Sequence, residues 1–305
     1  MIEDLFSLMG MMFLLMLAGY LLRKKNIIRE EGKSTLVDII LDVILPCNIL
    51  NACLKEYTPE FWQVFPELMA AGLVAQAICL VIAKFCYNRM PEEEKNVYQY
   101  GTVCSNSGFM GNPLVEGVFG TLGLLYTSVI NIPQRIAMWT AGISYFQKGV
   151  DKKQVYLKVL VNPCMIAMYI GFVVMFTDIT LPAFMTRTVS AVSDCCTAMT
   201  MIYMGSILVD VDFREITNKK QIYFAVLRLI LIPLATYAGC RAVHVNALGT
   251  GVCTILAATP AGSTTSVLAA KYHADEIAAA KSVVFTTALS VITIPVWSYF
   301  LLRQL

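Results

Sequence analysis

The sequence has little charge and little histidine for its length, and both shortages narrow the range of functions. Charged residues make up 14% of the 305 residues, whereas soluble domains carry about 25%. Two histidines provide too few groups for the clustered His and carboxylate sites of many enzymes. The net charge of +2, without a run of basic and aromatic residues, also disfavours nucleic acid as a partner.

The ten cysteines lack the spacing of a metal site or a disulfide scaffold. They lie at positions 47, 53, 79, 86, 104, 164, 195, 196, 240 and 253, nearly all inside apolar runs. Free cysteine packs as a small hydrophobic residue. We therefore expect these cysteines to be core residues, and we expect neither a metal nor a cofactor.

Long apolar runs dominate the chain, which is 57% hydrophobic with a mean hydropathy of +0.66. A helix that crosses about 30 Å of hydrocarbon needs about 20 apolar residues, and these runs lack the alternation of barrel strands. The pattern predicts an all-α integral membrane protein. Its ten spans are 5–23, 35–54, 61–84, 98–118, 121–147, 155–177, 182–210, 221–241, 247–271 and 276–302. Residues 1–4 lack the positive charge that opens a signal peptide, so the first span is expected to be retained.

Basic residues alternate between the connections of these spans. The odd-numbered connections with their flanks contain seventeen Lys and Arg residues, whereas the even-numbered ones and the C-terminus contain four. Cytoplasmic loops of membrane proteins collect Lys and Arg. The alternation supports ten spans and predicts a cell-membrane protein with both termini outside the cytoplasm.

Residues 1–150 and 151–305 look like related halves of five spans each. Ser128-Val129 precedes Ser144-Tyr145-Phe146 in the fifth span, and Ser282-Val283 precedes Ser298-Tyr299-Phe300 in the tenth at the same spacing of 16. Because five is odd, the second half starts on the opposite side of the membrane. Such inverted repeats are frequent in secondary transporters, with the binding site at the midplane between the repeats.

The fourth and ninth spans contain residues that interrupt a helix. Residues 104–120 include four glycines, a proline, two asparagines and a glutamate, and residues 257–266 place a proline among small polar residues. Proline removes a backbone donor, and glycine weakens a helix by about 1 kcal/mol relative to alanine. Half-helix N-termini at such breaks carry partial positive charge. The paired interruptions predict a site for a small organic anion such as a carboxylate; two merely kinked helices are the alternative.

The polar residues beside the two prolines are the first candidates for the site. They are Asn106, Ser107 and Asn112 in the fourth span, and Gly262 and Ser263 with neighbouring threonines in the ninth. Arg135 in the fifth span is a further candidate, because a guanidinium fork binds carboxylates in two-point contact.

Three segments resemble the auxin efflux carrier family, especially members described as bacterial malate or malonate permeases. They are Ala258–Tyr272, Asn106–Leu114 and Leu45–Leu50, and the resemblance extends over the whole chain. It implies ten helices whose fourth and ninth members break and cross, as in bile acid symporter-like and sodium/proton antiporter-like folds. It also implies a scaffold domain of spans 1, 2, 6 and 7, and a moving transport domain of spans 3–5 and 8–10, which carry organic anions without ATP.

The resemblance also implies roles for individual positions. It places the crossing point at Asn112 with Pro113 and at Pro260 with Ala261. It places Asn48, Asn131 and Gln134 in the lining of the cavity. Glu116 departs from what an anion pocket is expected to contain: it could repel the substrate, carry a proton or face away.

Charged residues within spans are functional candidates, because burying a charge in hydrocarbon costs at least a few kcal/mol. The candidates for a coupled ion are Asp42, Glu116 and Asp194; structural ion pairing with Arg135 or Arg228 is the alternative for Asp42 and Asp194. We expect Asp38 to be paired at the cytoplasmic end and Lys281 to extend toward the inner face. His244 and His273 are expected in loops.

A secondary transporter that works by alternating access is the function that these features favour. A sodium- or proton-coupled symporter of dicarboxylates is a variant of it. A membrane-embedded enzyme would need clustered catalytic residues, and a channel would need a continuous polar lining. The expected partners are a small organic anion, the lipid bilayer and a second copy of the chain, and no enzymatic activity is expected.

Overall fold

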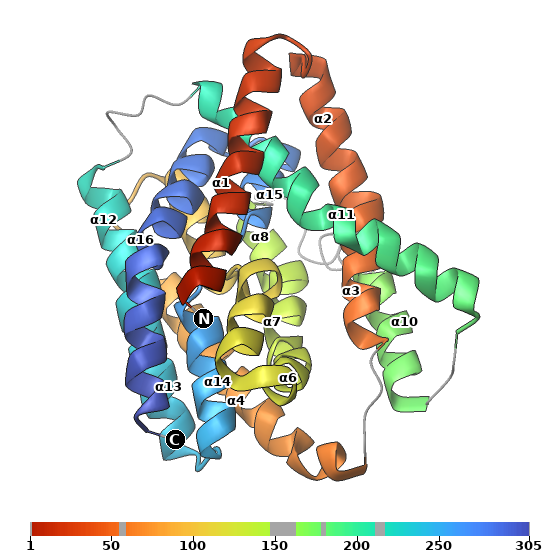
Figure 1. Ribbon diagram of the computed structural model, residues 1–305. Coiled ribbons are helices and arrows are strands. Elements are labelled where there is room, and N and C mark those ends of the chain that lie inside the picture. The colour runs from red at the N-terminus through yellow and green to blue at the C-terminus, as the bar shows by residue number, and fades with distance from the viewer. Residues whose placement is uncertain (1, 55–58, 147–162, 178–180, 211–216, 305) are drawn as a thin grey trace.

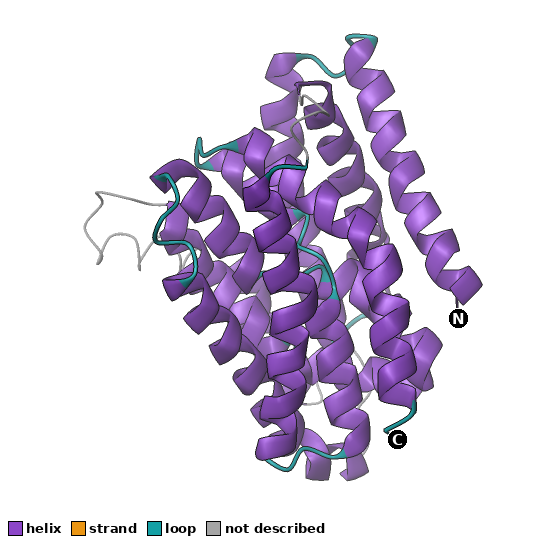
Figure 2. Cartoon of the chain, turned by 90° about the vertical axis from the view of Figure 1, so that its left-hand side faces the viewer, coloured by secondary structure: helices purple, strands orange, loops and turns teal. Residues whose placement is uncertain are grey.

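The computed structural model describes residues 2–54, 59–146, 163–177, 181–210 and 217–304 (Figure 1). Within these ranges the regular structure is helical and contains no strand (Figure 2). The helices are α1 Ile2–Lys24, α2 Glu30–Ile39, α3 Leu45–Cys53, α4 Pro59–Phe85, α5 Glu92–Val103, α6 Asn112–Ile130, α7 Ile132–Ala137, α8 Ile143–Phe146, α10 Pro163–Thr177, α11 Ala183–Ile207, α12 Lys219–Val226, α13 Ile232–Ala242, α14 Ala247–Ala258, α15 Thr264–Lys271 and α16 Glu276–Leu302.

These helices overlap the predicted spans, with revised boundaries. The fourth span begins at Glu92, earlier than predicted, and it ends at Gly120, where φ is +69° and the helix is interrupted inside α6. Glycine adopts this backbone conformation without the steric cost that a Cβ would bring. The remainder of α6 continues with α7 and α8 as the predicted fifth span. The predicted connection after 147 and the beginning of the sixth span lie outside the described residues.

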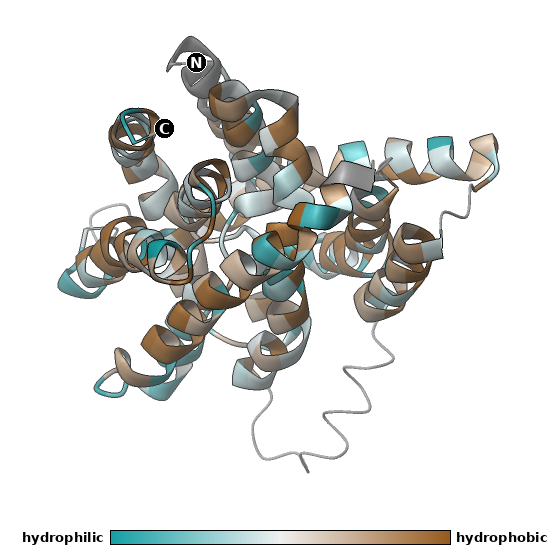
Figure 3. Cartoon of the chain, turned by 90° about the horizontal axis from the view of Figure 1, so that it is seen from below, coloured by the Kyte–Doolittle hydropathy of each residue, from teal (hydrophilic) through white to brown (hydrophobic). Residues whose placement is uncertain are grey.

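Among the described residues, four helical stretches are long and apolar enough to cross a membrane. They are Glu30–Asn51, Phe61–Phe85, Lys219–Ala242 and Glu276–Leu302, and α10 and α14 are shorter apolar helices. Large hydrophobic side chains remain exposed along single faces, such as Met11, Leu14, Leu17 and Leu21 on α1. Figure 3 shows hydrophobic residues on the outer helices around the molecule. Such faces suit a hydrocarbon solvent, because large exposed apolar patches are unfavourable in water.

Two groups of helices pack within the molecule. In one group α1 packs on α11, while α3 packs on both α10 and α11. In the other group α4, α5, α6, α13, α14 and α16 pack on one another. The groups meet where α15 contacts α2 and α11 and where α16 contacts α1. A division into scaffold and transport domains stays a prediction that this packing does not test.

Three of the helices widen into π-helical segments just before a proline. The π-helical segments Ile40–Ile44, Ser107–Gly111 and Leu227–Leu231 each end two residues before a proline. Proline lacks the N–H that would bond residue i−4, and its ring crowds that carbonyl. The carbonyl of Leu229, four residues before Pro233, instead accepts the indole N–H of Trp297 at 3.0 Å. In hydrocarbon, a freed backbone group needs such a substitute partner.

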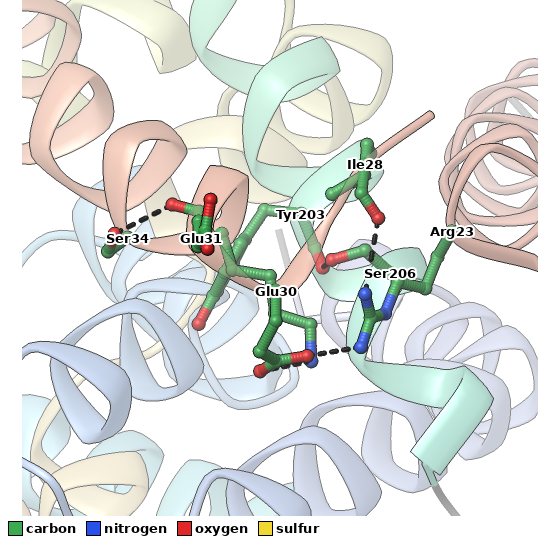
Figure 4. Close-up of polar contacts among 8 residues, drawn as sticks. Arg23, Ile28, Glu30, Glu31, Ser34, Tyr203 and Ser206 are labelled. Carbon is green, nitrogen blue, oxygen red and sulfur yellow. Dashed lines mark hydrogen bonds and ion pairs between the residues drawn. The ribbon is translucent and has the colours of Figure 1, made fainter. Parts of the chain in front are cut away.

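Ion pairs fasten the end of the molecule at which α1 turns into α2. Arg23 donates to the carbonyl of Ile28 at 3.3 Å and pairs with Glu30, as Figure 4 shows. Lys220 pairs with Glu94 at 2.6 Å, and Lys271 pairs with Asp38. The expectation that Asp38 is paired is therefore confirmed. Exposed pairs of this kind contribute about 0–1 kcal/mol each, so they link the connections more than they stabilise the fold.

The close packing of α1 on α11 depends on two glycines. A Cβ added at Gly205 of α11 would lie 1.8 Å from the Met16 carbonyl oxygen, and one at Gly19 of α1 would lie 2.0 Å from the Ile202 oxygen. We expect Gly205→Ala to lower the free energy of unfolding by about 1–3 kcal/mol or more, because the helices must separate. Thermal unfolding in detergent measures this.

Gly10→Ala is the matched control for this substitution. Gly10 is also on α1, but outside its own helical turn none of the described residues has an atom within 4 Å of the position that its Cβ would take. Alanine also favours helix more than glycine does. Equal unfolding temperatures for the two variants would contradict the proposed close contact.

Candidate functional site

The two interrupted helices meet, and the backbone of each break hydrogen-bonds to the backbone of the other. Helices α5 and α14 are both 12 residues long, and each is followed by extended backbone. Ser105 pairs with Ala261 in an antiparallel bridge. The Asn106 amide donates to the Pro260 carbonyl at 2.8 Å, and the Gly262 amide donates to the Cys104 carbonyl at 2.9 Å. Backbone groups that lose their helical partners are thereby satisfied without water.

The structure corrects one of the two predicted crossing points. The break at Thr259–Pro260 with Ala261 is confirmed, since Thr259 is extended with ψ 150°. The predicted break at Asn112–Pro113 is wrong: both residues begin α6, and the extended backbone lies earlier, at Cys104. Proline is tolerated in the first helical turn, where its missing N–H would have no partner in any case. The π segment Ser107–Gly111 then joins the break to α6.

A cavity with a volume of about 60 Å³ lies beside this crossing. Its walls come from α3, the first break, the α6–α7 region and the second break. The predicted site residues in its lining are Asn48, Asn106, Ser107, Asn131, Gln134, Arg135, Gly262 and Ser263. Leu45, Ile49, Ser105, Gly108, Met138 and Thr264 complete the lining. The structure therefore brings together candidates from both halves of the chain.

Four predicted residues do not line the cavity. Pro260 and Ala261 belong to the crossing itself, where the Ala261 amide donates to the Thr286 hydroxyl at 3.2 Å. Asn112 and Pro113 lie in the first turn of α6. Ser105 and Gly108 were not predicted, although both lie in the polar, glycine-containing stretch that indicated the break.

Gln134 holds the first break in place. Its Nε2 donates to the Ser105 carbonyl and to the Ser107 hydroxyl, both at 3.0 Å. Its Oε1 accepts from the Ser105 hydroxyl at 2.8 Å. Both amide hydrogens are thus used within the protein. Gln134 lines the cavity as predicted, but its geometry is that of a clamp on the break.

Asn106 and Ser263 offer polar atoms that the protein leaves without partners. Asn106 is 2% exposed and Ser263 1% exposed. Three of their atoms have no hydrogen-bond partner within the described part of the chain: Nδ2 and Oδ1 of Asn106, and Oγ of Ser263. A buried polar group left in this state costs about 1–3 kcal/mol. Such a group in a cavity wall is a candidate ligand-binding group.

The opposite wall of the cavity is anchored to the other packing group. Asn48 of α3 donates through Nδ2 to the Ser193 hydroxyl of α11 at 3.1 Å. Asn51 donates to the same hydroxyl at 3.4 Å. The Asn48 side chain is therefore oriented by α11, while Asn106 and Ser263 belong to the crossing.

Other charged candidates lie away from the cavity. Asp42, Glu116 and Asp194 are exposed and are not in its lining, and Glu116 thus faces away. His244 and His273 lie in turns, as predicted.

Two expectations about basic residues are wrong. Lys281 is only 9% exposed rather than extended to the surface. Arg228 is 1% exposed and pairs with no carboxylate among the described residues.

Comparison with known proteins places the chain among membrane transporters. The family described as Membrane transport protein matches residues 5–298. An uncharacterized transporter of Methanocaldococcus jannaschii is 22% identical over 305 residues, covering 95% of this chain and 96% of its own. An uncharacterized transporter of Methanothermobacter thermautotrophicus is 23% identical over 295 residues, covering 94% and 95%.

The clamp at Gln134 is testable by removing its hydrogen bonds. Gln134→Met keeps the length of the side chain but leaves the Ser105 carbonyl and the Ser107 hydroxyl without this donor. We expect the free energy of unfolding to fall by about 1–3 kcal/mol, measured by thermal denaturation. Thr140→Val is the control on the same span, because its hydroxyl bonds only its own helix, at 2.6 Å to Ile136. Equal effects of the two substitutions would refute the clamp.

Proposed function

The chain belongs to the membrane transport protein family, which includes the auxin efflux carriers that its motifs resemble, and on this premise we propose that it carries small carboxylates by alternating access. The protein is a multi-pass membrane protein, and the proposed binding site is the cavity at the crossing of the broken helices. The observation that carries the proposal is the pair of buried, unpartnered groups on Asn106 and Ser263 in the wall of that cavity.

The chemistry of the cavity favours an anion with hydrogen-bond acceptors. The polar lining consists of amides, hydroxyls and the guanidinium of Arg135, and none of its residues is acidic. The π segment from Ser107 and helix α15 from Thr264 both begin at the cavity, so their N-termini add partial positive charge. Amide and hydroxyl donors together with a guanidinium suit a carboxylate.

The arrangement of the walls supports a carrier rather than a channel. Asn48 belongs to the α1, α3, α10 and α11 group, whereas Asn106 and Ser263 belong to the crossing within the other group. Relative motion of the groups would open the cavity to one side at a time. The equal lengths of α5 and α14 and the antiparallel pairing of their breaks support the proposed inverted repeat of five spans.

The acidic candidates for ion coupling lie outside this cavity, so we propose binding of an anion there without assigning a coupled ion. Catalysis has little support from the cavity, because the described residues of its lining include no histidine, cysteine or carboxylate. The lining is thus suited to binding and release.

We propose a cell-membrane topology with both termini outside the cytoplasm. The ion pairs Lys220–Glu94 and Lys271–Asp38 join residues at odd-numbered connections, the basic ones. In Figures 1 and 2 the α1–α2 turn is at the top, whereas both chain ends lie in the lower half. Cysteines introduced at the two ends of the protein should react with a membrane-impermeant thiol reagent when the protein is in intact cells. Reaction only after the cells are permeabilised would contradict this topology.

Carboxylate recognition is testable with two asparagines. In a thermal-shift screen against mono- and dicarboxylates, a ligand that binds only the folded protein raises its unfolding temperature. For a carboxylate found in this way, Asn106→Ala should weaken binding roughly ten- to hundredfold, because a hydrogen bond to a charged group is worth about 1.5–3 kcal/mol. The unliganded variant should be at least as stable as the parent, since an unsatisfied buried group is removed.

Asn112→Ala is the matched control, because it makes the same chemical change outside the cavity lining. Its affinity for the carboxylate should stay within about threefold of the parent. Binding that is unchanged in Asn106→Ala, in protein shown to be folded, would remove the crossing from the site.

A further inference from the structure

A buried guanidinium near the crossing has no counter-charge among the residues that the structure describes. Arg228 is on the π segment Leu227–Leu231 and is 1% exposed. The titratable groups close enough to influence it are Cys79, Tyr87 and Cys104. None of these is a carboxylate. An arginine buried in this way is a costly feature that membrane proteins normally compensate with a partner.

Much of the hydrogen-bonding capacity of Arg228 is also unused. In the part of the chain that the structure describes, Nε and Nη1 of Arg228 have no partner. Nε2 of Gln76, one helical turn before Cys79 on α4, is buried and unpartnered as well. A residue whose only role was to link helices would be expected to have its donors satisfied. The unused donors therefore favour a role for the charge of Arg228 over a role in hydrogen bonding.

This charge is coupled to the proposed binding site through the first break. The π segment that carries Arg228 packs on α14, the helix that ends at the second break. Cys104, which is also near Arg228, is the residue whose carbonyl accepts from Gly262 at the crossing. The next residue, Ser105, lines the cavity, whereas Arg228 does not. Arg228 is thus outside the cavity lining, so it would act on a bound ligand only through its field.

We propose that Arg228 is a fixed positive charge that sets the charge selectivity of the cavity, acting through its field rather than by contact. The inference rests on the proposed function, which it deepens by naming a residue that makes the site select anions. A fixed charge on the order of 10 Å from a ligand, at an effective dielectric constant of about 20, would change the affinity for a monoanion roughly tenfold. Because Coulomb energy is proportional to charge, the affinity for a dianion should change roughly hundredfold, and the affinity for a neutral analogue should not change.

A thiol placed in the cavity measures this field without any knowledge of the substrate. Gly108 lines the cavity, and no atom lies within 4 Å of the position that its Cβ would take. In Gly108→Cys protein we would compare the rates of modification by an anionic and a cationic methanethiosulfonate reagent. The parent chain without this substitution gives the background from native cysteines, of which Cys195 is exposed.

Removing the charge should shift the preference between the two reagents. Arg228→Gln retains amide donors but removes the charge, so the anionic-to-cationic rate ratio should fall at least tenfold. Arg228→Lys keeps the charge and should stay near the parent ratio. Arg241→Met removes an exposed charge further along the same span and should leave the ratio unchanged. A thiol at Gly32 of α2, where a side chain also meets open space, should not respond to Arg228→Gln.

The outcomes separate a field from a structural role. An unchanged ratio in folded Arg228→Gln, or equal ratios in the Gln and Lys variants, would overturn the proposal; Arg228→Met replaces the Gln variant if that does not fold. Binding of butyramide, butyrate and succinate to the same proteins should show losses that increase with ligand charge. If no carboxylate binds the parent protein, the proposed function fails, while the reagent ratio still decides the role of Arg228.

Discussion

The antiparallel pairing of the two breaks is the interaction on which the rest of the site depends. A membrane interior offers no water to backbone groups, so neither break could persist alone. The bonds from Asn106 to Pro260 and from Gly262 to Cys104 let each break supply what the other lacks. The Gln134 clamp, the half-helix N-termini and the cavity all take their positions from this pairing.

The same requirement for internal partners explains features elsewhere in the fold. Three helices widen into π segments before prolines, and the Leu229 carbonyl, which Pro233 leaves without its helical donor, accepts from Trp297. Some buried side-chain atoms nevertheless lack a partner among the described residues, and those of Asn106, Ser263 and Arg228 are among them. They gather around one crossing, which is why we assign anion binding and charge selection to the same place.

Much of this arrangement follows from the sequence, and the exceptions have physical causes. The apolar runs located the helices, and the polar, glycine-containing stretches located the second break at Pro260 and showed that the fourth span is interrupted. The first break was misplaced because Pro113 begins a helix, where proline costs little, whereas Pro260 lies in the break itself. The periodicity of the sequence cannot reveal contacts between residues that are distant along the chain. It therefore did not show that the Gln134 amide makes all its hydrogen bonds within the protein, or that no described carboxylate pairs with Arg228.

The central claim is that the crossing forms part of a carrier that exposes one site to alternate sides. Counterflow in proteoliposomes tests it most directly: vesicles loaded with an excess of an unlabelled carboxylate are diluted into a trace of the same compound, radiolabelled. A carrier predicts transient accumulation of label inside, without ATP, because exchange through one site couples the two fluxes. Label that only equilibrates, as through a channel, or that does not enter beyond the level of empty vesicles for any carboxylate, would contradict the account.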